Sequence, residues 1–215
     1  MTVNDKRDDS MGKARPRARF VRETADVRRQ ALIEATARCL AEKGVGGTSV
    51  RAICAHAGVS SGLLIHYFDG VDALILATYA DVGAKVSAAL DAAVEAAGDD
   101  PRDRLRACLQ ANFLSPILDP DLLATWIAFW SLVKSDPKIA AVHAEVYGGA
   151  RAQLETLLRA AAPAMSDARV RVAAISLTAL VDGLWLELCL DRSTFSPEEA
   201  QAMVEDAMLQ VLAGI

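Results

Sequence analysis

The stretch TSVRAICAHAGVSSGLLIHYF, residues 48–68, decides the fold of this chain. It predicts two short helices joined by a tight turn, because Gly58 tolerates the left-handed backbone of a turn and Ser60 is a good N-cap for a second helix. Thr48 is expected to cap the first helix. With Gly58 counted as the ninth position of a helix-turn-helix, the small Cys54 is the fifth, and the fourth, eighth, tenth and fifteenth are apolar: Ile53, Ala57, Val59 and Leu64. The segment therefore predicts a helix-turn-helix whose second helix would enter a DNA major groove.

The rest of the chain is also predicted to be helical. From Thr24 onward the apolar residues recur at helical spacing, and no window alternates as a strand does. Four helix starts pair a side-chain acceptor with a following proline, as suits an N-cap and the first helical position: Asp100-Pro101, Asp119-Pro120, Asp136-Pro137 and Ser196-Pro197, the last with Glu199 as a capping box. We predict an all-α protein of nine helices, at about residues 24–43, 49–57, 60–68, 71–98, 101–115, 120–134, 137–161, 167–190 and 197–213.

The charge is unevenly distributed along the 215 residues. The formal net charge of -5 would by itself argue against a nucleic-acid partner, but residues 1–70 hold 12 Lys/Arg against 8 Asp/Glu, whereas residues 71–215 hold 11 against 20. We expect a disordered basic arm over residues 1–22, because this segment is too polar to bury a core. A helix-turn-helix DNA-binding domain is expected over 23–70, and an acidic ligand-binding and dimerisation domain over 71–215.

The sequence also argues against several classes of protein. The four cysteines form no CxxC pair and there are three histidines, so we expect no metal site, no disulfide framework and no cofactor. The N-terminus has no apolar signal-peptide core, and Asp182 and Glu187 interrupt the most apolar stretch, so we expect no membrane partner and a cytoplasmic location. Ser60 and Ser61 near His66 lack a nucleophile elbow, which argues against an enzyme.

The helix-turn-helix segment resembles the TetR family of one-component bacterial regulators. The resemblance rests on Cys54, on Ala57-Gly58-Val59-Ser60, on Gly62 and on Tyr67-Phe68, and it extends through Arg28-Arg29-Gln30. The alternative is a generic helical hairpin in which these apolar residues are only core. The chain departs from the common family pattern at Ile65, where an aromatic hydroxyl is frequent, and at Val71, where a lysine is frequent.

The resemblance implies double-stranded operator DNA as a partner. Hydroxyl groups, backbone N–H groups at a helix start and arginines suit phosphate oxygens, and an aliphatic side chain can contact a thymine methyl. The DNA-facing candidates are Arg28, Thr48, Arg51, Ser60, Ser61, Gly62, Leu63, His66 and Tyr67. A plain surface histidine is the alternative interpretation of His66. We expect the basic arm to compensate for the missing lysine by entering the minor groove.

The acidic region holds three strings that resemble the choline-responsive, betaine-related branch of the family. They are Asn112-Phe113, Trp126-Ile-Ala-Phe-Trp130 and Val181-Asp182-Gly-Leu-Trp185-Leu. Aromatic faces with a carboxylate suit a quaternary ammonium ion, and either Asp182 or Glu187 could supply the charge. Ordinary core packing is the alternative for the aromatic residues. The candidate effector-binding residues are Phe113, Trp126, Phe129, Trp130, Tyr147, Asp182 and Trp185.

A recognition helix in one groove reads little sequence, so we expect a homodimer on two half-sites. The resemblance implies that the last two helices pair with their copies as a four-helix bundle, with Gly183 allowing close approach. The candidate interface residues are Leu177, Leu180, Leu184, Leu188, Val204, Met208 and Leu212. We predict a repressor released from its operator by a small-molecule effector, choline or another quaternary amine. A ligand-responsive activator and a helical adaptor that does not bind DNA are the alternatives.

Overall fold

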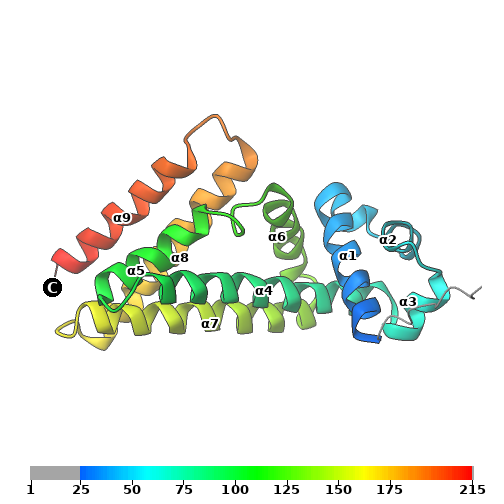
Figure 1. The fold of residues 1–215 in the computed structure, drawn as a ribbon, viewed down its shortest axis with the longest axis horizontal. Coiled ribbons are helices and arrows are strands. Elements are labelled where there is room, and N and C mark those ends of the chain that lie inside the picture. Colours follow the sequence, from blue (N-terminus) through cyan, green and yellow to red (C-terminus); the bar gives the residue numbers. More distant parts are fainter. Residues whose placement is uncertain (1–24, 215) are drawn as a thin grey trace, which may run out of the picture.

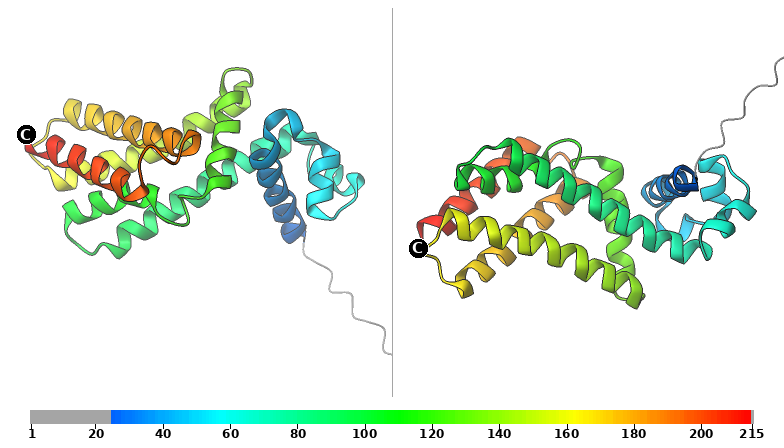
Figure 2. Two further views of the ribbon diagram at one scale, coloured as in Figure 1. Left: turned by 90° about the horizontal axis from the view of Figure 1, so that it is seen from above. Right: turned by 60° about the horizontal axis from the view of Figure 1, so that its bottom comes forward.

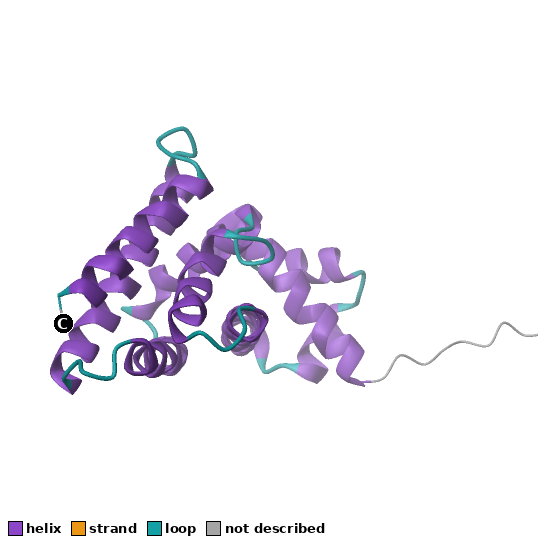
Figure 3. Ribbon diagram, turned by 60° about the vertical axis from the view of Figure 1, so that its left-hand side comes forward, coloured by secondary structure: helices purple, strands orange, loops and turns teal. Residues whose placement is uncertain are grey.

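The structure is a computed structural model that describes residues 25–214, and within this range it is built from helices and loops alone (Figure 3). The elements in chain order (Figure 1) are α1 (Ala25–Gly47), α2 (Val50–Ala57), α3 (Ser61–Tyr67), α4 (Gly70–Ala96), α5 (Pro101–Gln110), the 3₁₀ turn η1 (Ala111–Phe113), α6 (Pro120–Val133), α7 (Pro137–Ala161), α8 (Asp167–Leu190) and α9 (Pro197–Ala213). The expected all-α fold is confirmed. The basic arm expected over residues 1–22 lies outside the described residues.

The predicted side-chain caps are present at the starts of α5, α6, α7 and α9. The carboxylates of Asp100, Asp119 and Asp136 each accept from two backbone N–H groups of the helix that follows, with proline at the start of the helix. Ser196 and Glu199 form a capping box at the start of α9. Each cap satisfies N–H groups that have no partner inside the helix, so these starts are set locally by the sequence.

The start of α2 differs from the prediction, because Ser49 and not Thr48 is its N-cap. The Ser49 hydroxyl accepts from the N–H of Ala52, while the buried Thr48 hydroxyl donates to the carbonyl of Gly44 at 2.8 Å. Gly44 has a positive φ of 62°, so α1 is kinked there and runs on beyond the end predicted for it. Thr48 therefore stabilises the corner between α1 and α2 instead of capping a helix.

The fifth helix is shorter than the predicted range of 101–115. It ends at Gln110 and continues as the 3₁₀ turn. The Asn112 side-chain amide donates to the carbonyls of Cys108 and Leu109, which satisfies the carbonyls that a helix end leaves open. Pro116 follows and disfavours further helix at the residue before it.

Two hydrophobic clusters form the core of the described chain. The smaller is built from α1, α2, α3 and the start of α4, and includes Leu32, Ile53, Cys54 and Leu64. The larger cluster contains residues of every helix from α4 through α9. The fourth helix serves both, since Leu74 belongs to the first cluster and its neighbour Ile75 to the second. Figure 1 shows α1 to α3 at one end of the molecule and α4 leading away from them.

Two long helices, α4 and α7, lie side by side along the larger cluster and run in the same direction (Figures 1 and 2). The Tyr79 hydroxyl lies 2.8 Å from Nδ1 of His143, and further along the Gln153 amide donates to Asp91 at 2.6 Å. The eighth helix runs antiparallel to α7, because Tyr147 contacts Asp182 whereas Arg159 contacts Asp167. Together α4, α7 and α8 form three sides of the space in which a ligand site is found.

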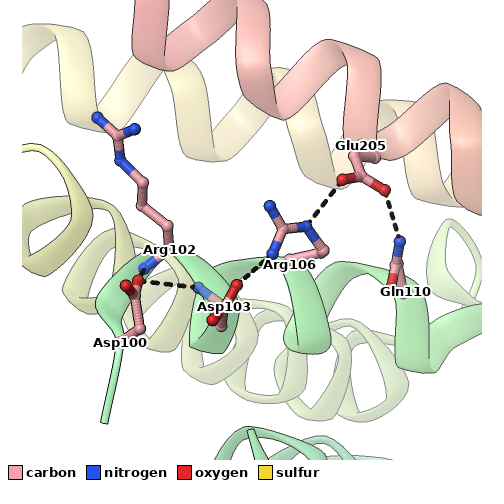
Figure 4. A network of polar contacts seen from close by, with 6 residues as sticks. All are labelled: Asp100, Arg102, Asp103, Arg106, Gln110 and Glu205. Atoms are coloured by element: carbon pink, nitrogen blue, oxygen red, sulfur yellow. Dashed lines mark hydrogen bonds and ion pairs between the residues drawn. The ribbon is translucent and has the colours of Figure 1, made fainter. Parts of the chain in front are cut away.

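The last helix is held on α5 by a polar network, shown in Figure 4. The Arg106 guanidinium donates from Nε to Glu205 at 2.8 Å and also pairs with Asp103. Gln110 donates to the other oxygen of Glu205 at 3.0 Å. Both Glu205 oxygens are thus engaged, which sets the register of α9 against α5.

The helices α4 and α8 are long and apolar enough to cross a membrane by length and composition alone. Both also supply residues to the protein core, such as Tyr79 and Val82 on α4 and Val170 and Leu177 on α8. Core helices of soluble proteins share these properties, so the two helices are weak evidence for a membrane span.

Candidate DNA-binding surface and effector cavity

The turn between α2 and α3 has the geometry that the sequence predicts. Gly58 adopts φ 65° and its N–H bonds to the carbonyl of Cys54, and the Ser60 hydroxyl accepts from the N–H of Leu63. Ile53 and Leu64 are fully buried and Cys54 nearly so. Burial raises the pKa of the Cys54 thiol, which keeps it protonated and agrees with a packing role.

The face of α3 opposite its buried side is open to solvent. Ser60, Ser61, Gly62 and His66 are exposed, as is Arg51 on α2. Leu63 and Tyr67 on α3, and Arg28 on α1, are half-buried. Thr48 is the exception among the candidate DNA-facing residues. It is only 8% exposed and its hydroxyl already has an internal acceptor, so we do not carry it forward as a DNA contact.

Ile65 is an exposed residue of α3 that was not among the candidate DNA contacts. It is 64% exposed, the largest exposed fraction of a large apolar side chain in α1 to α3. Its departure from the family pattern was the signal in the sequence that could have pointed to it.

Arg29 is a second residue whose role the sequence did not reveal. Its guanidinium lies 4.2 Å from the centre of the Phe68 ring, and it donates to the carbonyl of Tyr67 at 3.2 Å. These contacts hold α1 on the end of α3 through a cation–π interaction and a hydrogen bond. The neighbouring Gln30 donates to Asp81 at 3.3 Å, which ties α1 to α4 as well.

In the helical body that follows the DNA-binding end, a cavity of about 440 Å³ lies among α4, α5, α6, α7 and α8. That volume is within the range of small-molecule sites. Of the seven candidate effector-binding residues, the cavity is lined by Trp126, Tyr147, Asp182 and Trp185. Three helices thus bring together an aromatic group and a carboxylate that are far apart in the sequence.

The Tyr147 hydroxyl organises this part of the cavity. It accepts from the indole N–H groups of Trp126 and Trp130, each at 3.1 Å, and donates to Asp182 at 3.2 Å. The Trp185 indole donates to the backbone carbonyl of Asn112 at 2.7 Å. All three indole N–H groups are therefore satisfied, which leaves the ring faces as the groups available to a ligand.

Asp182 is the carboxylate of the site. Burial raises the pKa of Asp182 to about 6, although the hydrogen bond from Tyr147 and the charge of Arg151 act in the opposite direction. The acid is therefore largely ionised at neutral pH and carries a partly desolvated negative charge. Glu187, the other candidate for this charge, is exposed and does not line the cavity.

Three of the candidate effector-binding residues do not line the cavity. Phe113 and Phe129 are 1% and 0% exposed and belong to the hydrophobic core. Phe129 stacks on Tyr79 with ring centres 4.3 Å apart, which joins α6 to α4. Trp130 contacts the site through its bond to Tyr147. Helical spacing identified the aromatic residues but could not separate the cavity side of α6 from the core side.

The sixth helix connects the cavity to the DNA-binding end. Trp126 faces the cavity, while its neighbour Thr125 is 2% exposed and donates from its hydroxyl to the carbonyl of Ala37 on α1 at 3.1 Å. The helices α1 and α6 pack extensively on one another. The sixth helix therefore contacts both the cavity and the DNA-binding end.

The exposed face of α8 and α9 differs from the predicted dimer interface. Leu177, Leu184, Leu188, Val204, Met208 and Leu212 are all buried in their own chain, and Leu180 is half-buried. These rows pack within the subunit because two neighbouring helices first cover one another's apolar faces. Other apolar side chains of these helices are exposed: Val172, Ile175 and Leu190 on α8 and Met203 and Leu209 on α9, with Gly183 also at the surface. Figure 2 shows α8 and α9 side by side at the far end from α1 to α3.

No cluster of three or more metal-ligating side chains occurs among the described residues. The four cysteines are free thiols. The combination that remains is a helix-turn-helix with an exposed recognition face, joined by α4 and α6 to a helical body that encloses a ligand-sized cavity. This combination defines a class of protein, the one-component regulators in which one chain binds both DNA and an effector.

The comparisons with known proteins agree with this class. Residues 32–78 match the family described as bacterial regulatory proteins, tetR family, and residues 101–213 match the BetI-type transcriptional repressor C-terminal family. The chain is 35% identical over 188 residues to the HTH-type transcriptional regulator BetI of Burkholderia thailandensis, covering 87% of this chain and 95% of that protein. The chain belongs to the TetR family of transcriptional regulators, with a BetI-type C-terminal domain.

Solved structures support the same fold. The crystal structure of a putative transcriptional regulator from Pseudomonas aeruginosa PAO1 matches with a TM-score of 0.83 and 43% identity, over 91% of this chain and 95% of that chain. A putative transcriptional regulator from Saccharomonospora viridis in complex with choline matches with a TM-score of 0.73 and 20% identity, over 84% and 95% of the two chains. The protein is thus a DNA-binding regulator and not an enzyme.

Proposed function

We propose that this protein represses transcription as a dimer bound to a two-fold symmetric operator, and that a small organic cation in the cavity releases it. The observation that carries the effector assignment is the convergence of Trp126, Tyr147, Trp185 and Asp182 on one cavity. A cation attracts both aromatic faces and a carboxylate, whereas an anion would be repelled by Asp182. The choline bound by the Saccharomonospora viridis regulator supports a quaternary ammonium ion.

DNA contact is assigned to the exposed side of α2 and α3. The hydroxyls of Ser60 and Ser61 and the side chains of Arg51, His66 and Tyr67 would bind phosphates and set the register on the duplex. Gly62, Leu63 and Ile65 would face base edges, because an aliphatic side chain contacts the thymine methyl. Arg28 would contribute from α1. The DNA-binding domain on this assignment comprises residues 23–70, and residues 71–215 sense the effector and dimerise.

Dimerisation is assigned to the exposed surface of α8 and α9. Val172 and Ile175 on α8, with Met203 and Leu209 on α9, present apolar surface that a second copy would cover. Gly183 lacks a side chain at this surface and would permit close helix approach. Two-fold symmetry would place the recognition helices in grooves about one turn, ~34 Å, apart.

The proposed switch acts through α6 as well as α4. A ligand held against Trp126 shifts the preferred position of α6, and the Thr125 contact carries that shift to α1. The stack of Phe129 on Tyr79 carries it to α4. Ligand weakens DNA binding only as far as it prefers the conformation in which the two half-sites no longer fit. The site of action would be the cytoplasm.

The test is binding of operator DNA recovered from genomic fragments, measured by fluorescence anisotropy with and without choline, alongside calorimetry of choline binding. We expect an affinity for operator DNA that weakens steeply with salt, because phosphate contacts release counterions even though the net charge is -5. Arg51→Ala and His66→Ala should abolish it, and Trp126→Ala should abolish choline binding. A salt-independent affinity would overturn the DNA assignment, and binding of choline unaffected by Trp126→Ala would overturn the effector site.

A further inference from the structure

The cavity is longer than a small ammonium ion needs. Its volume of about 440 Å³ is within the range of sites for drug-sized molecules, roughly 300–1,000 Å³, whereas choline has only about seven non-hydrogen atoms. Along α7 the lining continues from Tyr147 to Leu154, and the helix rise between these residues is about 10 Å.

The two parts of the cavity differ in chemistry. Around Tyr147 the wall holds Asp182 and two indole rings. Toward Leu154 the wall is formed by Leu90, Cys108 and Leu109, which are almost completely buried, as is Leu154 itself. Burial keeps the Cys108 thiol protonated by raising its pKa, so this group adds no charge there.

The polar residues toward the far end do not change this contrast. The Gln153 amide is already bonded to Asp91 across the α4–α7 contact at 2.6 Å. Ser87 is exposed, at the outer edge of the lining. The Thr178 hydroxyl on α8, one turn before Asp182, is a further polar group of the lining on this side. Beyond it, a ligand that extends toward Leu154 meets aliphatic side chains, where a methylene chain is favoured and a polar group would lose its hydrogen bonds to water.

The lining between α4 and α7 reaches the surface at small exposed residues, namely Ala80 and Ala84 on α4 and Gly149 and Ala150 on α7. Glu145, also exposed, adds a negative charge at the same edge, where an acidic rim attracts cations.

We infer that the effector is an amphiphilic cation, with its ammonium group at Asp182 and an aliphatic tail that extends along α7 toward Leu154. This inference rests on the proposed effector site and specifies the class of its ligand. An extended chain advances about 3.5 Å for every three bonds, so about eight methylenes span the ~10 Å available.

The test is a series of alkyltrimethylammonium ions of increasing chain length, with choline as the short member, titrated into the full-length protein by calorimetry. Affinity should rise by about two- to fourfold per methylene and stop rising near eight. Alkanols of equal length should bind much more weakly, because they lack the charge. Constant affinity along the series, or alkanols that bind equally well, would overturn the inference.

Variants at the aliphatic end separate this inference from the effector site itself. Cys108→Phe should flatten the chain-length profile, because the ring occupies the aliphatic end of the cavity, and Leu114→Phe, at an exposed position outside the cavity, is the control. If Cys108→Phe fails to fold, Leu109→Ala should instead move the optimum to a longer chain. Choline binding with no gain from a tail refutes the amphiphilic ligand alone. Failure of every ammonium ion in the series refutes the proposed effector as well.

Discussion

The Thr125 hydroxyl on α6 donates to the backbone carbonyl of Ala37 on α1 at 3.1 Å, one residue away from a tryptophan that lines the effector cavity. This contact joins the sensing and DNA-binding parts of the chain with side chain and backbone that are both largely shielded from solvent. It gives the first prediction, since its removal changes the connection without touching either binding surface.

Thr125→Val should keep effector affinity and reduce the effect of effector on DNA binding. The substitution preserves shape and removes one buried hydrogen bond, at a cost of about 1 kcal/mol of folding free energy. The operator dissociation constant is measured with and without saturating effector. The ratio of these two constants should fall several-fold. Thr156→Val, which removes an exposed hydroxyl bonded within α7, is the control. An unchanged ratio in Thr125→Val would show that this contact does not transmit the signal.

Asp182 should make effector binding dependent on pH. With its pKa at about 6, the carboxylate is ionised at pH 7 and becomes protonated as the pH falls through 6. Affinity for a quaternary ammonium ion should therefore fall by about tenfold per pH unit below 6. Calorimetry from pH 5 to 8 checks this. In Glu187→Gln the same decline should persist, because Glu187 lies outside the cavity.

The same group should affect stability in the opposite sense to binding. The folded-state pKa of Asp182 lies above its ordinary value of 3.8, so the native state takes up a proton more readily than the unfolded chain. The contribution of Asp182 to the free energy of unfolding is most favourable below about pH 4 and declines as the pH rises through 6. Asp182→Asn should consequently raise the free energy of unfolding of the ligand-free protein at pH 7 by about 1 to 3 kcal/mol, and the melting temperature with it. The same substitution should abolish cation binding. A lower melting temperature at pH 7 would contradict this.

Tyr147→Phe should weaken effector binding more than the loss of one contact suggests. It leaves the indole N–H groups of Trp126 and Trp130 without their acceptor and removes a donor from Asp182. A buried donor without a partner costs about 1 to 3 kcal/mol. Tryptophan fluorescence and effector titration should both change, whereas Tyr67→Phe, outside the cavity, should leave effector binding as it is.

Ile65 should read thymine in each operator half-site. Replacing a single thymine by deoxyuracil at the contacted position removes one methyl group and should lower affinity about fourfold per half-site. Ile65→Ala should lower affinity for the normal operator and make it insensitive to that replacement. Leu114→Ala, an exposed leucine outside the DNA-binding helices, is the matched control. If deoxyuracil still weakens binding of Ile65→Ala, another side chain makes the contact.

Leu209→Glu should dissociate the dimer without unfolding the subunit. Leu209 is 46% exposed on α9, so a charge there is tolerated in the monomer and disfavoured in an apolar interface. The dimer dissociation constant should rise by at least about a hundredfold, measured by sedimentation, and operator binding should be lost with it. Leu114→Glu should remain dimeric. A dimeric Leu209→Glu would place the interface elsewhere.

The helix-turn-helix and the helix starts were predictable because their determinants are local. Gly58 with a positive φ, the Ser60 cap and the aspartate caps of α5, α6 and α7 each act within a few residues. The N-cap of α2 was predicted one residue early, since Thr48 and Ser49 are both suitable caps and only the kink at Gly44 provides Thr48 with another acceptor.

The faces of the long helices could not be predicted in the same way. Leucine rows on α8 and methionine and valine on α9 are equally suited to a neighbouring helix or to a second subunit, and the packing within the chain covers them first. Likewise Phe129 and Trp126 stand three residues apart on α6 and both belong to the core, yet only Trp126 also lines the cavity. Helical spacing shows which residues share a face but not what covers that face.

By itself the sequence determined the all-α architecture, the recognition helix and the aromatic and acidic composition of the effector site, because short-range capping, turn and periodicity rules govern each of them. Only the tertiary structure decided that Asp182 rather than Glu187 meets the aromatic rings, that the cavity continues to Leu154, and that α6 contacts α1 at Ala37. These features depend on how helices far apart in the chain rotate and pack against one another, and no local pattern specifies that rotation.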